Sequence, residues 1–250
     1  MAVSAGWPAV LREQPKPLLA VSAAGWALLA LQDTSYAVPA PCLSAATSAA
    51  AGLIAALTLN PPLWLGLAWL AMLAAMMPPL LAQPLLYLWH RSLRHRRMRA
   101  IALFVVGYGT VWLAAGLVLT LLAIVLDALS PLPGVALAWL IALAWQSTPL
   151  KQSCLNRCHR QAPLAAFGLR ADADALQYGL SHGAWCAGAC WALMLIPPMA
   201  GRIHLVVMVT VMLIQVVERA RQSQAPRWGA SFPSLAPSAR IAATFMRRSA

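Results

Sequence analysis

The chain has 250 residues, of which 61% are hydrophobic and only 10% are charged. A soluble domain of ordinary composition carries about 25% charged residues, so this composition excludes a soluble enzyme and a disordered chain. The mean hydropathy of +0.71 indicates a polytopic membrane protein. The net charge of +12 comes from 18 basic and 6 acidic residues. Because no soluble domain is left to hold DNA or RNA, this charge indicates basic loops and no nucleic-acid partner.

Six apolar runs are predicted to cross the membrane, which needs about 20 helical residues per span. The runs cover residues 18–36, 63–89, 100–126, 133–145, 175–197 and 203–217. The fourth run reaches the required length if it begins near Leu129. Pro78 and Pro79 lie inside the second run and should kink it or end its straight part. The predicted fold is therefore an all-α polytopic bundle of about six transmembrane helices.

The segment 44–59 is apolar but dominated by Ala, with several Ser and Thr residues. We interpret it as an interfacial or re-entrant helix, with a seventh span as the alternative. Six spans place 17 of the 18 Lys and Arg residues on one side, which the positive-inside rule makes cytoplasmic. Both termini are then cytoplasmic, and a seventh span would weaken this bias by moving Arg12 and Lys16 outward.

This topology predicts three parts of the chain: a cytoplasmic N-terminus at 1–17, a transmembrane metal-binding domain at 18–219, and a flexible basic cytoplasmic tail at 220–250. Arg outnumbers Lys sixteen to two, and Ala and Leu dominate, as in proteins of GC-rich bacteria. The expected location is a bacterial inner membrane. The basic loop 90–99 is expected to fix topology and contact lipid phosphates, and the alternative is a ligand site built on His90 and His95.

Four cysteines form two pairs with the same spacing, Cys154 with Cys158 and Cys186 with Cys190. A spacing of four residues places two sulfurs on one face of a helix, one turn apart. Two such pairs can converge on one soft metal ion, because thiolates, thioethers and imidazoles select Cu(I) or Zn(II). The alternative is that the cysteines are small apolar filler.

Further soft ligands lie in the same spans. In the fifth span His182, Cys186, Cys190 and Met194 recur every four residues. An imidazole inside a bilayer is costly unless it has a partner or a task. The alternative is a structural histidine whose ring is hydrogen-bonded to a nearby carbonyl and binds no metal.

The second span contributes Met72, Met76 and Met77, which alone would be read as packing residues. Counted from the outer ends at about 1.5 Å per residue, Met72 and Cys190 lie about 14 and 11 Å deep. On the same count, Met76 and Cys186 lie about 20 and 17 Å deep. If the two spans are neighbours, their sulfur atoms can enclose one site near the midplane.

Cys154 and Cys158 belong to the loop between the fourth and fifth spans. Ser147 or Thr148 can cap a short helix there, with Pro149 in its first turn. Lys151 and Arg157 are basic neighbours that should lower the pKa of both thiols. The loop pair is therefore predicted to be an accessible thiolate pair that passes metal to Cys186 and Cys190.

These residues also support a resemblance that covers about residues 63–219. The matching pieces are Trp69-x2-Met72-x3-Met76-Met77-Pro78, Thr148-Pro-Leu-Lys-x2-Cys154-x3-Cys158, Gly179-x2-His182-Gly-x2-Cys186-x3-Cys190-Trp-Ala-Leu-Met194 and Glu218. The chain resembles a domain-of-unknown-function family of predicted metal-binding bacterial membrane proteins, some labelled copper chaperones. The resemblance implies metal binding and establishes neither transport nor catalysis. Members often have two adjacent cysteines where this chain has Ala189 and Cys190, and Asn is expected near His204.

The leading functional prediction is a non-enzymatic membrane protein that handles Cu(I), with zinc as the alternative metal. Its expected partners are membrane lipids and a protein that donates or accepts copper. One alternative is a membrane thiol–disulfide oxidoreductase, which needs cysteines on the oxidising outer side, where only Cys42 clearly lies. The other alternative is a membrane scaffold with inert cysteines.

Overall fold

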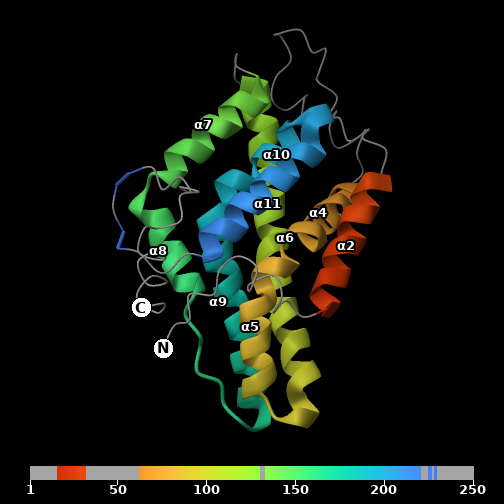
Figure 1. Ribbon diagram of the computed structural model, residues 1–250, viewed down its shortest axis with the longest axis vertical. Helices are drawn as coiled ribbons and strands as arrows, with labels where there is room; N and C mark the ends of the chain where they lie inside the picture. The colour runs from red at the N-terminus through yellow and green to blue at the C-terminus, as the bar shows by residue number, and fades with distance from the viewer. Residues whose placement is uncertain (1–15, 32–61, 130–132, 221–224, 227, 230–250) are drawn as a thin grey trace, which may run out of the picture.

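The computed structural model describes residues 16–31, 62–129, 133–220, 225–226 and 228–229. Every regular element in these residues is a helix, which confirms the predicted all-α class. Figure 1 shows their arrangement. The α-helices are α2 (Lys16–Leu31), α4 (Pro62–Met76), α5 (Pro78–Arg91), α6 (Arg97–Leu129), α7 (Gly134–Gln146), α8 (Pro149–Cys158), α9 (Gly168–Met194), α10 (Ile196–Met199) and α11 (His204–Ala220). Two short 3-10 turns, η1 (Arg94–Arg96) and η2 (Gly201–Ile203), precede α6 and α11.

The two longest helices, α6 and α9, lie side by side and form the centre of the bundle (Figure 1). Glycines allow their backbones to approach closely. A Cβ at Gly107 would lie 2.6 Å from the carbonyl oxygen of Leu176, and a Cβ at Gly179 would collide with the carbonyl oxygen of Phe104. Only a residue without a Cβ permits this approach at either position, so α6 holds the middle of α9 in place.

The helix predicted from the second apolar run breaks at Met77, as Pro78 and Pro79 suggested. The segments Gly66–Met76 and Pro78–Arg91 meet at 70°. Pro78 takes the first turn of α5, where a missing N–H group costs nothing. Helix α2 packs on α4, and the Ser22 hydroxyl donates a 2.6 Å hydrogen bond to the carbonyl oxygen of Ala75. This contact holds the end of α4 just before the break.

The predicted number of six spans is not supported. In the described residues, the helical stretches Arg94–Leu126 and Gly168–Met199 are long and apolar enough to cross a membrane. The bent pair α4–α5 would make a third span. Helices α2, α7 and α11 have 16, 13 and 17 residues. At about 1.5 Å per residue they fall short of an approximately 30 Å core. The segment 44–59, for which an interfacial helix was predicted, lies outside the described residues.

The predicted loop helix is present as α8. The Thr148 hydroxyl caps it by accepting a hydrogen bond from the backbone N–H of Lys151, and Pro149 occupies the first helical position. Helix α8 packs along α9. The indole N–H of Trp145, at the end of α7, donates to the carbonyl oxygen of Gly188 in α9. The loop cysteines are thereby held against the helix that carries the second pair.

Candidate metal centre

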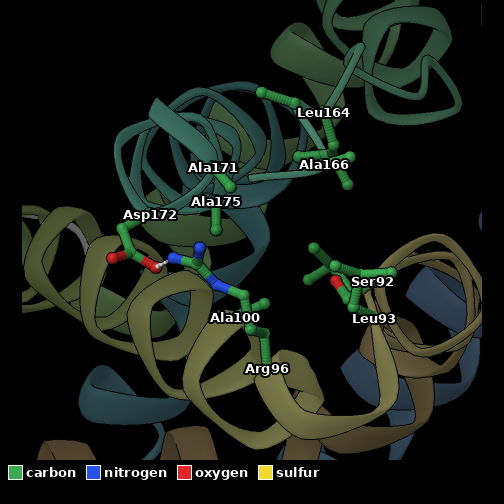
Figure 2. Close-up of a pocket in the computed structure, with 11 residues that line it drawn as sticks. Ser92, Leu93, Arg96, Ala100, Leu164, Ala166, Ala171, Asp172 and Ala175 are labelled. Carbon is green, nitrogen blue, oxygen red and sulfur yellow. Dashed lines mark hydrogen bonds and ion pairs between the residues drawn. The ribbon is translucent and has the colours of Figure 1, made fainter. Parts of the chain in front are cut away.

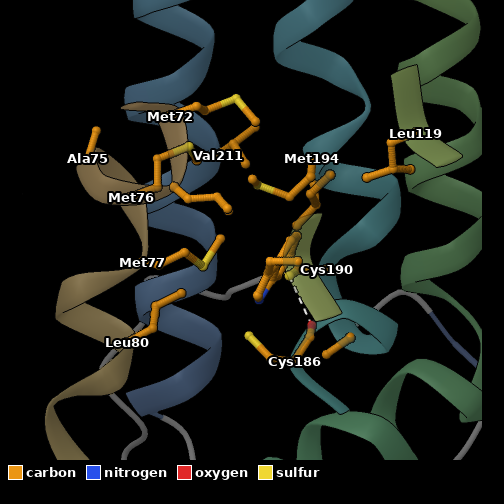
Figure 3. Packing of buried hydrophobic residues seen from close by; sticks show 14 of the residues in the cluster. Met72, Ala75, Met76, Met77, Leu80, Leu119, Cys186, Cys190, Met194 and Val211 are labelled. Atoms are coloured by element: carbon orange, nitrogen blue, oxygen red, sulfur yellow. Dashed lines mark hydrogen bonds between the residues drawn. The ribbon is translucent and has the colours of Figure 1, made fainter. Parts of the chain in front are cut away.

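Cys186 and Cys190 lie one turn apart on α9, and both side chains are buried. The Cys190 thiol donates a 3.0 Å hydrogen bond to the carbonyl oxygen of Cys186 (Figure 3). The Tyr108 hydroxyl, from α6, lies 3.4 Å from the Cys186 sulfur. The spacing of four residues therefore placed both thiols on one face, as predicted, and that face points into the protein core.

Five methionines belong to the same buried cluster as the α9 cysteines. They are the four predicted ligands Met72, Met76, Met77 and Met194, together with Met208. Figure 3 shows the methionines of the α4–α5 segment on one side of this core and Met194 of α9 on the other. Val211 of α11 lies between them in the same view. On this side of Cys190 the core consists of thioethers and aliphatic side chains, which suits a soft metal ion.

His182 lies one turn before Cys186 and is only 2% exposed. Its ring is surrounded by the aromatic rings of Phe104, Tyr108 and Tyr178, with centroids 5.8, 6.1 and 5.9 Å away. Neither ring nitrogen has a hydrogen-bond partner in the described residues. The alternative of a histidine hydrogen-bonded to a carbonyl therefore gains no support from the described residues, and a buried imidazole without a partner is costly unless a ligand completes it.

The loop pair is less accessible than predicted. Cys158 is buried and Cys154 is half-buried against α9. A Cβ at Gly188 would lie 3.0 Å from the Cys154 sulfur, so the two helices are in close contact at this point. The two cysteine pairs are thus on adjacent, packed helices, whereas the sequence predicted one pair in an accessible cytoplasmic loop and the other inside a membrane span.

The prediction that Cys154 and Cys158 are low-pKa thiolates is wrong. Burial raises the pKa of Cys154, and the positive charge of Arg157 offsets only part of that effect. Burial raises the pKa of Cys158 to about 12, against the opposing charge of Arg219. Lys151 does not act on the thiols as expected, because its ammonium group pairs with Glu218. Both groups are therefore thiols at neutral pH.

These pKa shifts predict a specific pH dependence of alkylation. Because only the thiolate reacts, raising the pKa lowers the reactive fraction at neutral pH, and reactivity returns as the pH rises. At pH 7.5 we expect iodoacetamide to label Cys158 at least about tenfold more slowly than free cysteine, with Cys154 faster than Cys158. Mass spectrometry of quenched samples at pH 7.5 and 9.5 measures both rates. Protein denatured in SDS is the control, and labelling of Cys158 at the free-cysteine rate in the folded protein would contradict the expectation.

Sequence reasoning missed the role of Arg219. Its guanidinium Nη2 donates a 2.9 Å hydrogen bond to the Cys186 sulfur from the end of α11. Arg219 also lines a small cavity between α5, α8, α9 and α11. The other residues around this cavity are Leu80, Leu155, Cys186, Ala189, Cys190, Gln215 and Glu218. In the sequence Arg219 is one of the 17 basic residues predicted to be cytoplasmic, and no spacing links it to Cys186.

Lys151 and Glu218 form a buried ion pair with a separation of 2.6 Å. The amide Nε2 of Gln146 donates to the same carboxylate oxygen at 2.8 Å. This network joins the end of α7 and the start of α8 to α11, and so fixes the position of the loop cysteines. In the sequence only the family resemblance indicates a role for Glu218. A single acid at the end of an apolar run is itself a signal, because such a carboxylate requires a partner.

The basic loop 90–99 is organised by one acidic residue. Arg96 and Arg99 pair with the carboxylate oxygens of Asp172 at 2.6 and 2.8 Å. Figure 2 shows the shallow pocket in which Arg96 meets Asp172, at the end of the bundle where α6 and α9 begin. Part of this loop therefore ties α6 to α9. Neither His90 nor His95 lines this pocket, so the alternative of a ligand site built on them gains no support.

The described residues contain no group of three or more His, Cys, Asp or Glu side chains that could hold one metal ion. The predicted ligands therefore do not form a ready four-coordinate centre. The donors that do gather are two thiols of one helix and the thioethers around them. Two-coordinate and three-coordinate sulfur sites suit Cu(I), whereas structural zinc is almost always bound by four N, S or O ligands.

The comparison with protein families finds a match to more than half of the chain. Residues 66–248 match a family model, PpoB2, whose description is copper chaperone. The matched region includes both cysteine pairs, the methionines of the α4–α5 segment, His182, Glu218 and Arg219. No curated protein and no solved structure matches the chain.

Proposed function

The chain belongs to this copper chaperone family, and we propose that it is an integral membrane protein that binds Cu(I) as cargo on Cys186 and Cys190. The observation that supports this most directly is the chemistry of the core. Two buried thiols one helical turn apart share a cluster with five buried methionines. Such sulfur donors select Cu(I) over harder ions, and both thiols release their protons when the metal binds.

The remaining predicted ligands take supporting roles in this proposal. Met77 and Met194, on opposite sides of the core, are the proposed thioether ligands for a third coordination position, and Met72 and Met76 belong to the same buried cluster. His182 lies one turn before Cys186 on α9. Its ring nitrogens have no hydrogen-bond partner in the described residues and are available to bind the metal. Weak thioether ligands leave a Cu(I) ion exchangeable, which is the property that a chaperone requires.

Cys154 and Cys158 provide the route by which copper reaches this core or leaves it. Helix α8 packs on α9, so the two pairs can exchange one metal ion by successive replacement of ligands. Cys154 is the more exposed of the two and is the thiol that a donor or acceptor protein would meet first. The proposal therefore has a single accessible thiol, Cys154, in place of the predicted pair of accessible thiolates.

The proposed setting is a bacterial inner membrane with both termini in the cytoplasm. The low content of charged residues, the two long apolar helices and the bent α4–α5 pair support it. The Arg-rich loop at 90–99 would face the anionic cytoplasmic lipid surface. The proposed protein is a binding and transfer protein, not an enzyme.

Metal titration of the purified chain tests this proposal. In detergent, under anaerobic and reducing conditions, we expect binding of about one equivalent of Cu(I) against a colorimetric Cu(I) chelator. An equal concentration of Zn(II) should not displace it, because thioethers are poor zinc ligands. Preference for zinc at neutral pH would contradict the copper assignment. Failure to bind either metal would favour the scaffold with inert cysteines.

A further inference from the structure

Arg219 is a partly buried cation without an acidic partner. Within the described residues no carboxylate lies at ion-pair distance from its guanidinium, because the adjacent Glu218 is turned toward Lys151. The acceptor that Arg219 does contact is the Cys186 sulfur, at 2.9 Å. A positive charge inside a protein is costly unless a negative group balances it. The arrangement therefore calls for an anion at the position of Cys186.

A Cu(I) ion held by two thiolates is such an anion. One positive charge on the metal and two negative charges on the sulfurs leave a net charge of −1 on the complex. In a core of low dielectric constant this charge is unfavourable unless the protein supplies a cation or hydrogen-bond donors. Arg219 supplies the single positive charge that makes the assembly neutral.

A second observation points to the same place. Gln215, one turn before Arg219 on α11, is 2% exposed, and neither its amide nitrogen nor its amide oxygen has a partner in the described residues. Gln215 lines the small cavity that Cys186, Cys190 and Arg219 also line. A buried amide without partners is costly in itself, and an anionic complex at this cavity would give its N–H group an acceptor.

We propose that Arg219 is the charge-compensating residue of an anionic Cu(I)–dithiolate complex at Cys186 and Cys190, held there by its hydrogen bond to the Cys186 sulfur. This inference rests on the proposed function. It adds a residue that does not bind the metal itself but makes the site prefer a metal–dithiolate complex with a net charge of −1. Because outer-shell hydrogen bonds also orient ligands, Arg219 fixes the direction of the Cys186 sulfur.

The test compares metal ions of different charge that bind to the same two thiolates. Hg(II) on two thiolates is neutral, whereas Cu(I) and Ag(I) on two thiolates carry −1. Replacing Arg219 with Gln should weaken Cu(I) and Ag(I) binding by about tenfold or more and leave Hg(II) binding nearly unchanged. Arg219→Lys keeps the charge and should restore Cu(I) binding to within a few-fold. Competition titrations of the purified full chain measure each dissociation constant.

Arg160→Gln is the matched control, because it removes one positive charge from an exposed position. It should leave the binding of all three metals unchanged. Equal weakening of Cu(I) and Hg(II) in Arg219→Gln, including complete loss through misfolding, would assign Arg219 a structural role and overturn the inference. Unchanged Cu(I) binding in Arg219→Gln would overturn it as well. Failure of the wild-type chain to bind Cu(I) would instead overturn the proposed function.

Discussion

The double variant Cys186→Ser, Cys190→Ser is expected to lose Cu(I) binding by more than about a hundredfold, since even residues outside the ligand shell change metal affinity by roughly 10–100-fold. Serine keeps the size of each side chain but offers a hard oxygen in place of a soft thiolate, and the surrounding thioethers alone bind Cu(I) weakly. Copper content after dialysis against a chelator, together with competition titration, measures the loss.

The matched control for that experiment is Cys154→Ser, Cys158→Ser, which removes the same number of thiols from the adjacent helix. If the α8 pair serves transfer, this variant should acquire copper from a donor more slowly and keep an equilibrium affinity within a few-fold of the wild type. An equally severe loss of affinity would mean that the two pairs form one site. Cys154 packs closely on Gly188 of α9, so the α8 pair lies near enough to the α9 pair for a single shared site to be the alternative.

Breaking the Lys151–Glu218 ion pair should be the most destabilising polar substitution in the described residues. The two side chains are 1% and 5% exposed. Lys151→Met leaves the Glu218 carboxylate buried with only the Gln146 amide to contact it, which should lower the free energy of unfolding by about 3–5 kcal/mol. Unfolding in SDS, followed by tryptophan fluorescence, measures the change.

Two further variants separate the loss of the pair from a general intolerance to substitution. The double variant Lys151→Met, Glu218→Met leaves no buried charge behind and should recover much of the loss. Arg99→Met removes a charge whose side chain is 64% exposed and should cost about 1 kcal/mol or less. A small effect of Lys151→Met would show that water reaches Glu218.

The sequence by itself determined the local features of this protein. The low content of charged residues and the apolar runs predicted an all-helical chain, because a backbone in an apolar setting satisfies its hydrogen bonds within helices. The Pro78-Pro79 pair predicted the break in the second run, and Thr148 with Pro149 predicted the start of α8. The spacing of Cys186 and Cys190 predicted their shared face. Each feature depends on residues within one or two turns of each other.

Only the tertiary structure decided which helices are long enough to span, and what surrounds each functional group. Hydropathy located the apolar runs, but the described helices α2, α7 and α11, with 16, 13 and 17 residues, are shorter than the roughly 20 residues that a span needs. Burial by neighbouring helices raises the pKa of Cys158 and outweighs the opposing charge of Arg219, which comes from a distant part of the sequence. Arg219 meets Cys186 across 33 positions of sequence, and Lys151 meets Glu218 across 67. Electrostatic interactions act through space, so the partners of a charge are fixed by packing and not by spacing along the chain.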